Sequence, residues 1–237
     1  MNIIVTGASR GIGYELVRQF SRSPENRILT ISRNAQGLEK LHRECLKDNP
    51  ESDIISLPFD LEAGSHIADD LGGRVRSHMD RLDILINNAG YLIRESFTVL
   101  TEEKFRKCLD VNYIAPVLLI QSLLDLLQKS QAAHVVNISS MGGVLGSKKF
   151  SGLSAYSASK AALQVLTECL AEEFKEGNIA FNSIALGAVQ TEMLAEAFPG
   201  YKAPIKADEI AGFIADFAIN GRRFFQGKTI QVSLSTP

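Results

Sequence analysis

The sequence predicts an α/β fold in which a doubly wound parallel sheet is flanked by helices. Short apolar runs alternate with longer segments of helical period along the chain, and this alternation implies right-handed crossovers between parallel strands. Most of the runs are continuously apolar, which is typical of strands buried on both faces. The chain has 237 residues, 45% of them hydrophobic, and no linker or repeat divides it. We therefore expect residues 1–237 to form a single domain.

Seven strands are expected, at residues 2–6, 27–32, 54–59, 83–87, 134–138, 179–185 and 228–232. Between them, apolar residues recur every three or four positions within 12–20, 113–127 and 163–174, so each of these segments is predicted to be a helix with one face on the sheet. Pro116 falls either in the first turn of the second of these helices or at a kink within it. Residues 191–206, "TEMLAEAFPGYKAPIK", contain two prolines and a glycine and are expected to form a mobile flap beside a site.

Composition and charge exclude several classes of function. The net charge of -2 and the pI of about 6.1 give no electrostatic reason to bind nucleic acid or an anionic membrane. The three cysteines and four histidines are scattered, so neither a disulfide framework nor a metal site is expected. The N-terminal "MNIIVTG" predicts a strand rather than a signal peptide, and no apolar run approaches the roughly 18 residues that span a bilayer. The sequence thus predicts a soluble, cytoplasmic protein with no metal.

A glycine-rich turn, "TGASRGIG" at residues 6–13, follows the first strand and opens the first helix. Glycines allow the backbone to approach a pyrophosphate, and the helix N-terminus offers free N–H groups and the positive end of its dipole. A tight turn without a ligand is the alternative, but the position between a strand and a helix favours dinucleotide binding. The residues of this turn assigned to the cofactor are Gly7, Ser9, Arg10, Gly11, Ile12 and Gly13.

The second strand ends in "ISRN", where an NAD site commonly carries an acid for the ribose 2′-hydroxyl. Here the residues are Ser32 and Arg33, and Arg33 and Arg10 could clamp a 2′-phosphate, so NADP(H) is favoured over NAD(H). Both arginines could instead be solvated surface groups. Asp60 and Leu61, after the third strand, are expected near the adenine, although Asp60 could equally be a surface cap.

The motifs "TGASRGIG", "NNAG" (87–90), "NISS" (137–140) and "YSASK" (156–160) occur in this order, and together they resemble the classical short-chain dehydrogenase/reductase family. The resemblance covers nearly the whole chain. It implies a single Rossmann-like domain with a seven-stranded parallel sheet, a nicotinamide cofactor, and a homodimer or homotetramer built on the long central helices.

The resemblance also implies a role for particular residues. Tyr156 is similar to the catalytic acid/base of the family, Lys160 to its partner and Ser140 to the serine that orients the substrate. Asn112, in "LDVNYIAP", matches the asparagine that supports a proton-relay water. The remaining matches are Asn88, Ala89 and Gly90, on the adenosine side, and Gly187, Val189 and Thr191, in the loop that holds the nicotinamide carboxamide.

The chemistry explains why these residue types are needed. Tyrosine has a pKa of about 10, and a nearby ammonium such as that of Lys160, one helical turn away, is expected to lower it. Tyr156 could then exchange a proton with a carbonyl oxygen that Ser140 binds. Taken singly, Ser140 and Asn112 could be no more than capping residues, and the hydroxyl of Tyr156 could point into water.

The chain departs from the family pattern at several positions. Leu186 stands where the family usually has proline before Gly187, which is expected to loosen the loop under the nicotinamide. The C-terminal "QVSLSTP" lacks the usual Asp-Gly-Gly, and this puts the assembly in doubt. Lys148 and Lys149 could attract an acidic substrate or could simply be solvated.

The predicted function is that of an NADP(H)-dependent short-chain oxidoreductase that reduces a ketone or aldehyde to an alcohol, or catalyses the reverse. Small carbonyl compounds, acyl-carrier-protein thioesters and sugar- or pterin-like rings all remain candidate substrates. A non-catalytic sensor of nicotinamide redox state and a scaffolding or signalling protein are the alternatives, and neither would need Ser140, Tyr156 and Lys160 together.

Overall fold

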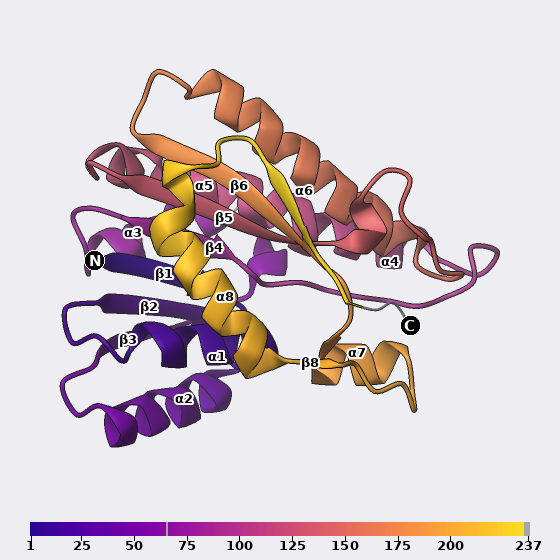
Figure 1. Cartoon of the computed structure of the whole chain (residues 1–237), viewed down its shortest axis with the longest axis horizontal. Coiled ribbons are helices and arrows are strands. Elements are labelled where there is room, and N and C mark those ends of the chain that lie inside the picture. Colours follow the sequence, from indigo (N-terminus) through magenta and orange to yellow (C-terminus); the bar gives the residue numbers. More distant parts are fainter. Residues whose placement is uncertain (65, 235–237) are drawn as a thin grey trace.

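A seven-stranded parallel sheet runs through the protein (Figure 1) in the order β3-β2-β1-β4-β5-β6-β9. The structure is a computed structural model and describes residues 1–64 and 66–234. The strands are β1 (Asn2–Thr6), β2 (Arg27–Ser32), β3 (Asp53–Pro58), β4 (Ile84–Asn87), β5 (Ala133–Ser140), β6 (Ile179–Leu186) and β9 (Thr229–Val232). The strand order reverses between β1 and β4, and a crevice at the carboxyl ends of the strands is expected at such a switch point. The predicted strands and the predicted fold class are confirmed.

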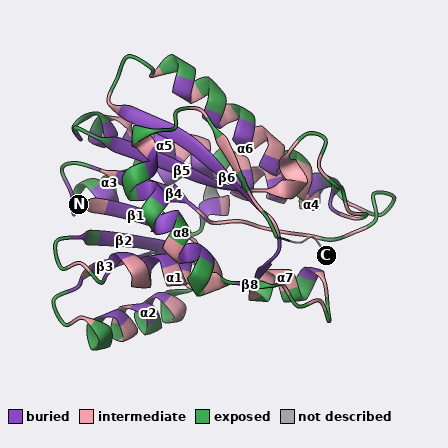
Figure 2. Ribbon diagram, in the orientation of Figure 1, coloured by how far each residue is buried: buried purple, intermediate pink, exposed green. Residues whose placement is uncertain are grey.

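Helices cover both faces of the sheet. They are α1 (Gly11–Phe20), α2 (Ala35–Asp48), α3 (Gly72–Arg76), α4 (Glu102–Leu109), α5 (Ala115–Gln128), α6 (Ser154–Glu173), α7 (Glu192–Ala197) and α8 (Ala207–Asn220). Apolar residues of α1, α2 and α8 form one core cluster with the sheet, and those of α3, α5 and α6 form the other. Along β1, Ile3 and Val5 belong to the first cluster and Ile4 to the second, which explains why the strand is continuously apolar. In Figure 2 the strands are largely buried and the outer sides of the helices exposed.

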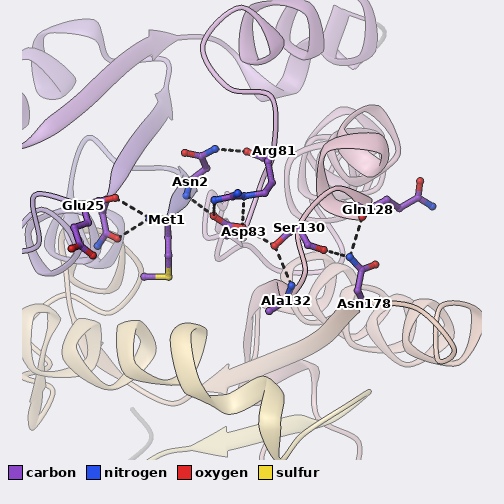
Figure 3. Close-up of polar contacts among 10 residues, drawn as sticks. Met1, Asn2, Glu25, Arg81, Asp83, Gln128, Ser130, Ala132 and Asn178 are labelled. Carbon is purple, nitrogen blue, oxygen red and sulfur yellow. Dashed lines mark hydrogen bonds and ion pairs between the residues drawn. The ribbon is translucent and has the colours of Figure 1, made fainter.

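A polar network ties the strands together at their amino ends, the side of the molecule that carries the N-terminus in Figure 1 (Figure 3). The Asp83 carboxylate accepts hydrogen bonds from the backbone N–H of Asn2 at 2.8 Å, from the Ser130 hydroxyl at 2.6 Å and from the Arg81 guanidinium. Burial alone would raise the pKa of Asp83, but these hydrogen bonds together hold it below its usual value. The amino ends of the strands thus carry a network that stabilises the fold. The candidate site lies at the opposite, carboxyl ends.

One helical stretch within the described residues, Glu102–Gln128, is long and apolar enough by length and composition to cross a membrane, with a mean hydropathy of 1.4 over its best window. This corrects the expectation that no segment approaches that length, because α4 and α5 join through a π-helical turn, Asp110–Ile114, into one continuous helix. Pro116 lies in the first turn of α5, as expected. The buried side of α5, including Leu119, Leu123 and Leu127, packs in the core against the sheet, which accounts for its apolar composition.

Residues 191–206, the segment expected to form a flap, contain regular secondary structure. The segment contains α7, whose N-cap Thr191 accepts a hydrogen bond from the backbone N–H of Leu194 at 3.3 Å. Its two ends are joined by a short parallel pair, β7 (Val189–Gln190) with β8 (Ile205–Lys206). The segment between β7 and β8 thus starts and ends at one short strand pair, on the right of Figure 1.

Candidate active site

A cavity of about 480 Å³ opens at the carboxyl ends of the strands, across the switch point between β1 and β4. Every site residue expected from the sequence lines it except Gly13 and Asn112. Those two lie just behind the lining, where Gly13 packs on Gly7 and Asn112 is hydrogen-bonded to Tyr91. The fold thus brings the glycine turn, the "NNAG" segment and the "YSASK" segment around one space.

The glycine turn has the geometry of a phosphate cradle. Gly7 and Gly11 have φ of +70° and +57°, which side chains other than glycine rarely adopt. A Cβ at Gly13 would lie 2.4 Å from the Gly7 carbonyl oxygen and 2.5 Å from the Asn88 amide nitrogen, so only glycine permits this close packing. The first turn of α1 has no acidic residue, and its N-cap, Arg10, makes no side-chain capping hydrogen bond. The free N–H groups and the positive end of the helix dipole are therefore available to a ligand in the cavity. The residues fit the pyrophosphate of a dinucleotide.

Both predicted arginines line the cavity and already have acidic neighbours. Arg33 is 3.8 Å from the Asp60 carboxylate and 3.9 Å from that of Glu62, and its side chain is 59% exposed. Arg10 pairs with Glu196, on α7, at 3.1 Å. These ion pairs are long or exposed and hence weak, so an incoming phosphate could compete for both guanidiniums.

The side chains of Ser9 and Ser32 face one another with their oxygens 2.8 Å apart, which fixes the turn beside the end of β2. The Asp60 carboxylate accepts the backbone N–H of Glu62 at 3.1 Å and caps the short 3₁₀ turn Leu61–Ala63. Asp60 is therefore a cap that also lines the cavity, so the two readings left open by the sequence are compatible.

Tyr156 and Lys160 share one face of α6, and the Lys160 ammonium nitrogen lies 6.0 Å from the centre of the Tyr156 ring. Lys160 is 4% exposed and donates a hydrogen bond of 2.8 Å to the Ile138 carbonyl. Burial lowers the pKa of Lys160 to about 8. Burial also raises the pKa of Tyr156, against the opposing effect of its hydrogen bond with the Ser140 side chain. The sequence argument expected Lys160 to lower the pKa of Tyr156. The pKa is raised instead, because burial has the largest effect on it.

Ser140 is the last residue of β5, and its hydroxyl accepts a hydrogen bond from the backbone N–H of Gly142 at 3.1 Å. Ser140 is thus a capping residue, which was one of the two interpretations of the sequence. Its side chain also forms a hydrogen bond with Tyr156 and lines the cavity. Since Ser140 accepts from Gly142, its single hydrogen can be donated either to Tyr156 or to a ligand in the cavity.

Asn112 does not cap a helix. It sits within the π-helical turn Asp110–Ile114, fully buried, and its amide donates to the Tyr91 carbonyl at 2.8 Å and to the Ser159 hydroxyl at 2.9 Å. Its side-chain oxygen accepts the N–H of Tyr91 at 2.7 Å. Ser159 in turn donates to the Tyr156 carbonyl, so this network ties the helix of Asn112 to the first turn of α6. π-Helical turns are frequent at functional sites.

The sequence analysis missed two residues beside the catalytic candidates. Ser159 is the fourth residue of "YSASK" and makes the link just described. Cys108, in the last turn of α4, is fully buried, and a charge on its thiol would raise the pKa of both Tyr156 and Lys160. Burial raises the pKa of Cys108 to about 11, so its thiol is neutral at physiological pH. The position of Cys108 four residues, about one turn, before Asn112 was the available signal.

The loop under the expected nicotinamide is held by backbone contacts. The N–H of Gly187 donates to the Val232 carbonyl at 2.8 Å, and Leu186 pairs with Val232 in the sheet. A Cβ at Gly187 would lie 2.1 Å from the Ser233 hydroxyl, so the C-terminal strand packs closely on this glycine. Leu186 therefore does not leave the loop without support. The last residues of "QVSLSTP", 235–237, lie outside the described residues.

Comparison with known proteins identifies the family. The chain matches the family model of the short chain dehydrogenases over residues 1–202, which is most of its length. It belongs to the short-chain dehydrogenase family, as the order of motifs indicated. It is accordingly an oxidoreductase, an NAD(P)-dependent dehydrogenase/reductase.

Its relatives act on different compounds. A fatty acyl-CoA reductase of Acinetobacter baylyi is 31% identical over 220 residues, covering 91% of this chain and 72% of that protein. The 5-keto-D-gluconate 5-reductase of Escherichia coli is 31% identical over 195 residues, covering 81% and 73%. Mouse dehydrogenase/reductase SDR family member 7B is 33% identical over 82% of this chain, but the match spans only 59% of that longer protein.

Solved structures show the same architecture. A short chain dehydrogenase of Shigella flexneri, crystallised with NADP, superimposes with a TM-score of 0.87 at 28% identity, covering 97% of this chain and 95% of the other. One from Escherichia coli, crystallised with NADPH, has a TM-score of 0.86 at 28% identity, with the same coverage.

Proposed function

We propose that this protein reduces a ketone or aldehyde to an alcohol with NADPH, or catalyses the reverse reaction. The observation that carries the proposal is that Ser140, Tyr156 and Lys160 line the same cavity as the glycine turn. The cofactors named in the structures of similar proteins, NADP and NADPH, support the choice of nucleotide. Carbonyl-dependent oxidation of NADPH by the purified protein tests it.

The proposed chemistry divides between cofactor and protein. When bound, the nicotinamide supplies a hydride to the carbonyl carbon. Tyr156 is protonated at neutral pH, because burial raises its pKa, and gives its proton to the carbonyl oxygen. Ser140 donates a hydrogen bond to that same oxygen and orients the carbonyl. In the reverse direction the phenolate accepts the proton from the alcohol, and the Lys160 ammonium favours that form.

The space beside Gly90 supports a proton relay to Lys160. A Cβ built at Gly90 would lie 3.4 Å from the Asn112 side-chain oxygen and 3.6 Å from the Lys160 ammonium nitrogen. Both polar atoms therefore lie beside a glycine, which places no side chain between them. We assign the relay water of the proposed mechanism to this space, where Asn112 and Lys160 would hold it and return a proton to Tyr156.

The pKa of Lys160, about 8, predicts that cofactor affinity depends on pH. In the proposed site the Lys160 ammonium would bind the nicotinamide ribose of an anionic cofactor, so binding would favour the protonated form. Affinity for NADPH should be constant below pH 8 and fall as pH rises through that value, by roughly tenfold between pH 7 and pH 9. Fluorescence titration across this range measures it. Lys160→Met should bind more weakly and without that fall, and a wild-type affinity that is flat to pH 9 would contradict the assignment.

NADP(H) is the proposed preference, because Arg10 and Arg33 flank the cavity where the 2′-phosphate of the adenosine ribose would lie. The hydroxyls of Ser9 and Ser32 lie between the glycine turn and β2 and could donate to the same phosphate. Asp60 and Glu62 lie near Arg33 at distances long enough for a phosphate with two charges to displace them. NAD(H) carries a 2′-hydroxyl in place of the phosphate, so its adenosine ribose would offer neither guanidinium a negative charge.

Glu196 competes with the phosphate for Arg10, and its replacement should strengthen NADPH binding slightly. In Glu196→Gln the ion pair at 3.1 Å is lost and Arg10 is free for the 2′-phosphate. Because both side chains are more than half exposed, the expected gain in affinity is only about two- to fivefold. Affinity for NADH, which has no 2′-phosphate, serves as the control and should not change. An equal gain for both cofactors would mean that Glu196 acts on the flap rather than on Arg10.

The compartment and the assembly are also proposals. The three cysteines are free, with Cys45 and Cys108 buried and Cys169 exposed, as expected for a reducing compartment such as the cytoplasm. A homodimer or homotetramer formed through α5 and α6 would cover Val165, which is 58% exposed on α6.

A further inference from the structure

Large apolar side chains make up part of the cavity lining, which we call the apolar end. This apolar end consists of Leu92, Met141, Phe150, Leu153, Met193 and Phe198. They come from three segments that are distant in sequence: the connection after β4, the connection between β5 and α6, and the flap with α7. The fold therefore builds this wall from the most variable kind of segment, the loops at the carboxyl ends of the strands.

Charged side chains line the cavity as well. Those that line it are Arg10, Arg33, Asp60, Lys107, Lys160 and Glu192. Lys107 pairs with Glu62 at 2.7 Å, next to Arg33, and the Glu192 carboxylate lies 3.6 Å from where a Cβ at Gly11 would be. Lys160 is directed to β5 by its bond to Ile138. Among the described residues, Arg94 and Lys148 lie over the rings of the apolar end, but neither lines the cavity.

Two aromatic rings form the centre of the apolar end. Phe150 and Phe198 pack edge to face, with centroids 5.8 Å apart and planes at 78°. The Arg94 guanidinium lies 4.5 Å from the centre of the Phe198 ring and donates a hydrogen bond of 3.1 Å to the Ala197 carbonyl. Lys148 lies 5.2 Å from the centre of the Phe150 ring. Lys148 and Lys149 are absent from the cavity lining, so the expectation that they meet an acidic substrate has no support here.

Backbone contacts hold the three segments together. The N–H of Glu95 donates to the Gly152 carbonyl at 2.9 Å. Gly152 has a φ of +85°, and a Cβ there would lie 3.1 Å from the Arg94 side chain, so Arg94 passes closely over this glycine. Arg94 thus joins the first two segments to the flap through Ala197 and Phe198. These contacts hold the side chains of the apolar end in place, and such preorganisation lowers the cost of binding.

We infer that the site takes an uncharged carbonyl compound that carries an aryl or alkyl group, with this group packed against Phe150 and Phe198. The inference rests on the proposed function and names its substrate class. An apolar group would gain from leaving water, whereas a polyol or sugar acid would lose hydrogen bonds that these six side chains cannot replace. Phe198 is the specificity-determining residue, and Arg94 is a positioning residue that acts through it.

The experiment compares carbonyl compounds of opposite polarity. Rates of NADPH oxidation are measured with acetophenone, 2-octanone and 5-keto-D-gluconate on wild type, Phe198→Ala, Arg94→Ala and the control Phe224→Ala, which removes a phenylalanine that is 75% exposed outside the cavity. We expect kcat/KM for the apolar ketones to exceed that for 5-keto-D-gluconate by at least about 100-fold. Phe198→Ala should lower kcat/KM for the apolar ketones about tenfold. Arg94→Ala should raise KM about two- to fivefold at nearly unchanged kcat, and Phe224→Ala should match wild type.

A binding measurement separates the substrate class from the proposed function. Calorimetry measures the affinity of the complex with NADP for acetophenone and for 5-keto-D-gluconate, in wild type and Phe198→Ala. Tighter binding of acetophenone that Phe198→Ala weakens supports the inference even if no compound is turned over, in which case only the proposed reaction fails. A preference for 5-keto-D-gluconate, equal effects of Phe198→Ala and Phe224→Ala, or no binding of either compound would overturn the inference. Turnover that depends on Tyr156 would still uphold the reaction in those cases.

Discussion

Replacing Tyr156 with phenylalanine is expected to reduce carbonyl-dependent turnover by about 10²- to 10⁴-fold, the usual contribution of a positioned general acid. The change removes only the hydroxyl that would protonate the carbonyl oxygen, and the ring continues to fill its half-buried place on α6. The NADPH dissociation constant should stay within about threefold of wild type, because Lys160 and the glycine turn are untouched. Steady-state kinetics and fluorescence titration measure the two quantities on the same preparation.

Tyr14→Phe provides a matched control for this prediction. It also removes a hydrogen-bonded phenol, since the Tyr14 hydroxyl donates to Glu44 at 2.6 Å, but Tyr14 lies on α1 and does not line the cavity. We expect it to lower thermal stability without lowering turnover. If Tyr156→Phe kept more than about a tenth of wild-type turnover, another group would have to supply the proton.

Replacing Arg33 with alanine is expected to have the second large effect, a loss of the preference for NADPH over NADH. A hydrogen bond between charged groups contributes enough free energy that its loss should weaken NADPH binding by about 10- to 100-fold. NADH binding should change little, because Arg33 has no partner on a ribose 2′-hydroxyl comparable to a phosphate. The ratio of the two dissociation constants, measured by fluorescence titration, is the readout.

Arg43→Ala is the control for Arg33→Ala. Arg43 is an exposed arginine on α2 that pairs with Glu39 at 3.4 Å and does not line the cavity. It tests whether a general loss of positive charge weakens NADPH binding, and we expect no change. Equal losses for NADPH and NADH in Arg33→Ala would contradict the assignment of the 2′-phosphate.

The strands and the cofactor turn could be predicted from the sequence because their signals are local. A strand buried on both faces must be apolar throughout, and residues 2–6 of β1 satisfy that condition without reference to any other segment. Gly7, Gly11 and Gly13 occur where the backbone needs a positive φ or close packing, and this requirement also appears in the sequence itself. The order of the four motifs then predicted a candidate site, and residues of all four line one cavity.

Features that depend on two distant segments could not be predicted in this way. Arg94 and Phe198 are more than a hundred residues apart, and no periodicity indicates that they meet. The pairing of β7 with β8 involves two residues on each side, too few for a strand pattern. The π-helical turn at Asn112 depends on tertiary bonds to Tyr91 and Ser159, and the raised pKa of Tyr156 depends on burial that only the folded chain supplies.

The rate of NADPH oxidation by the wild-type protein with apolar ketones and aldehydes, with NADH measured in parallel, tests the central claim most directly. The account predicts turnover that requires a carbonyl compound, is faster with NADPH at subsaturating cofactor and disappears in Tyr156→Phe. Tight NADPH binding without oxidation by any carbonyl compound would contradict it and would favour a protein that senses the cofactor instead.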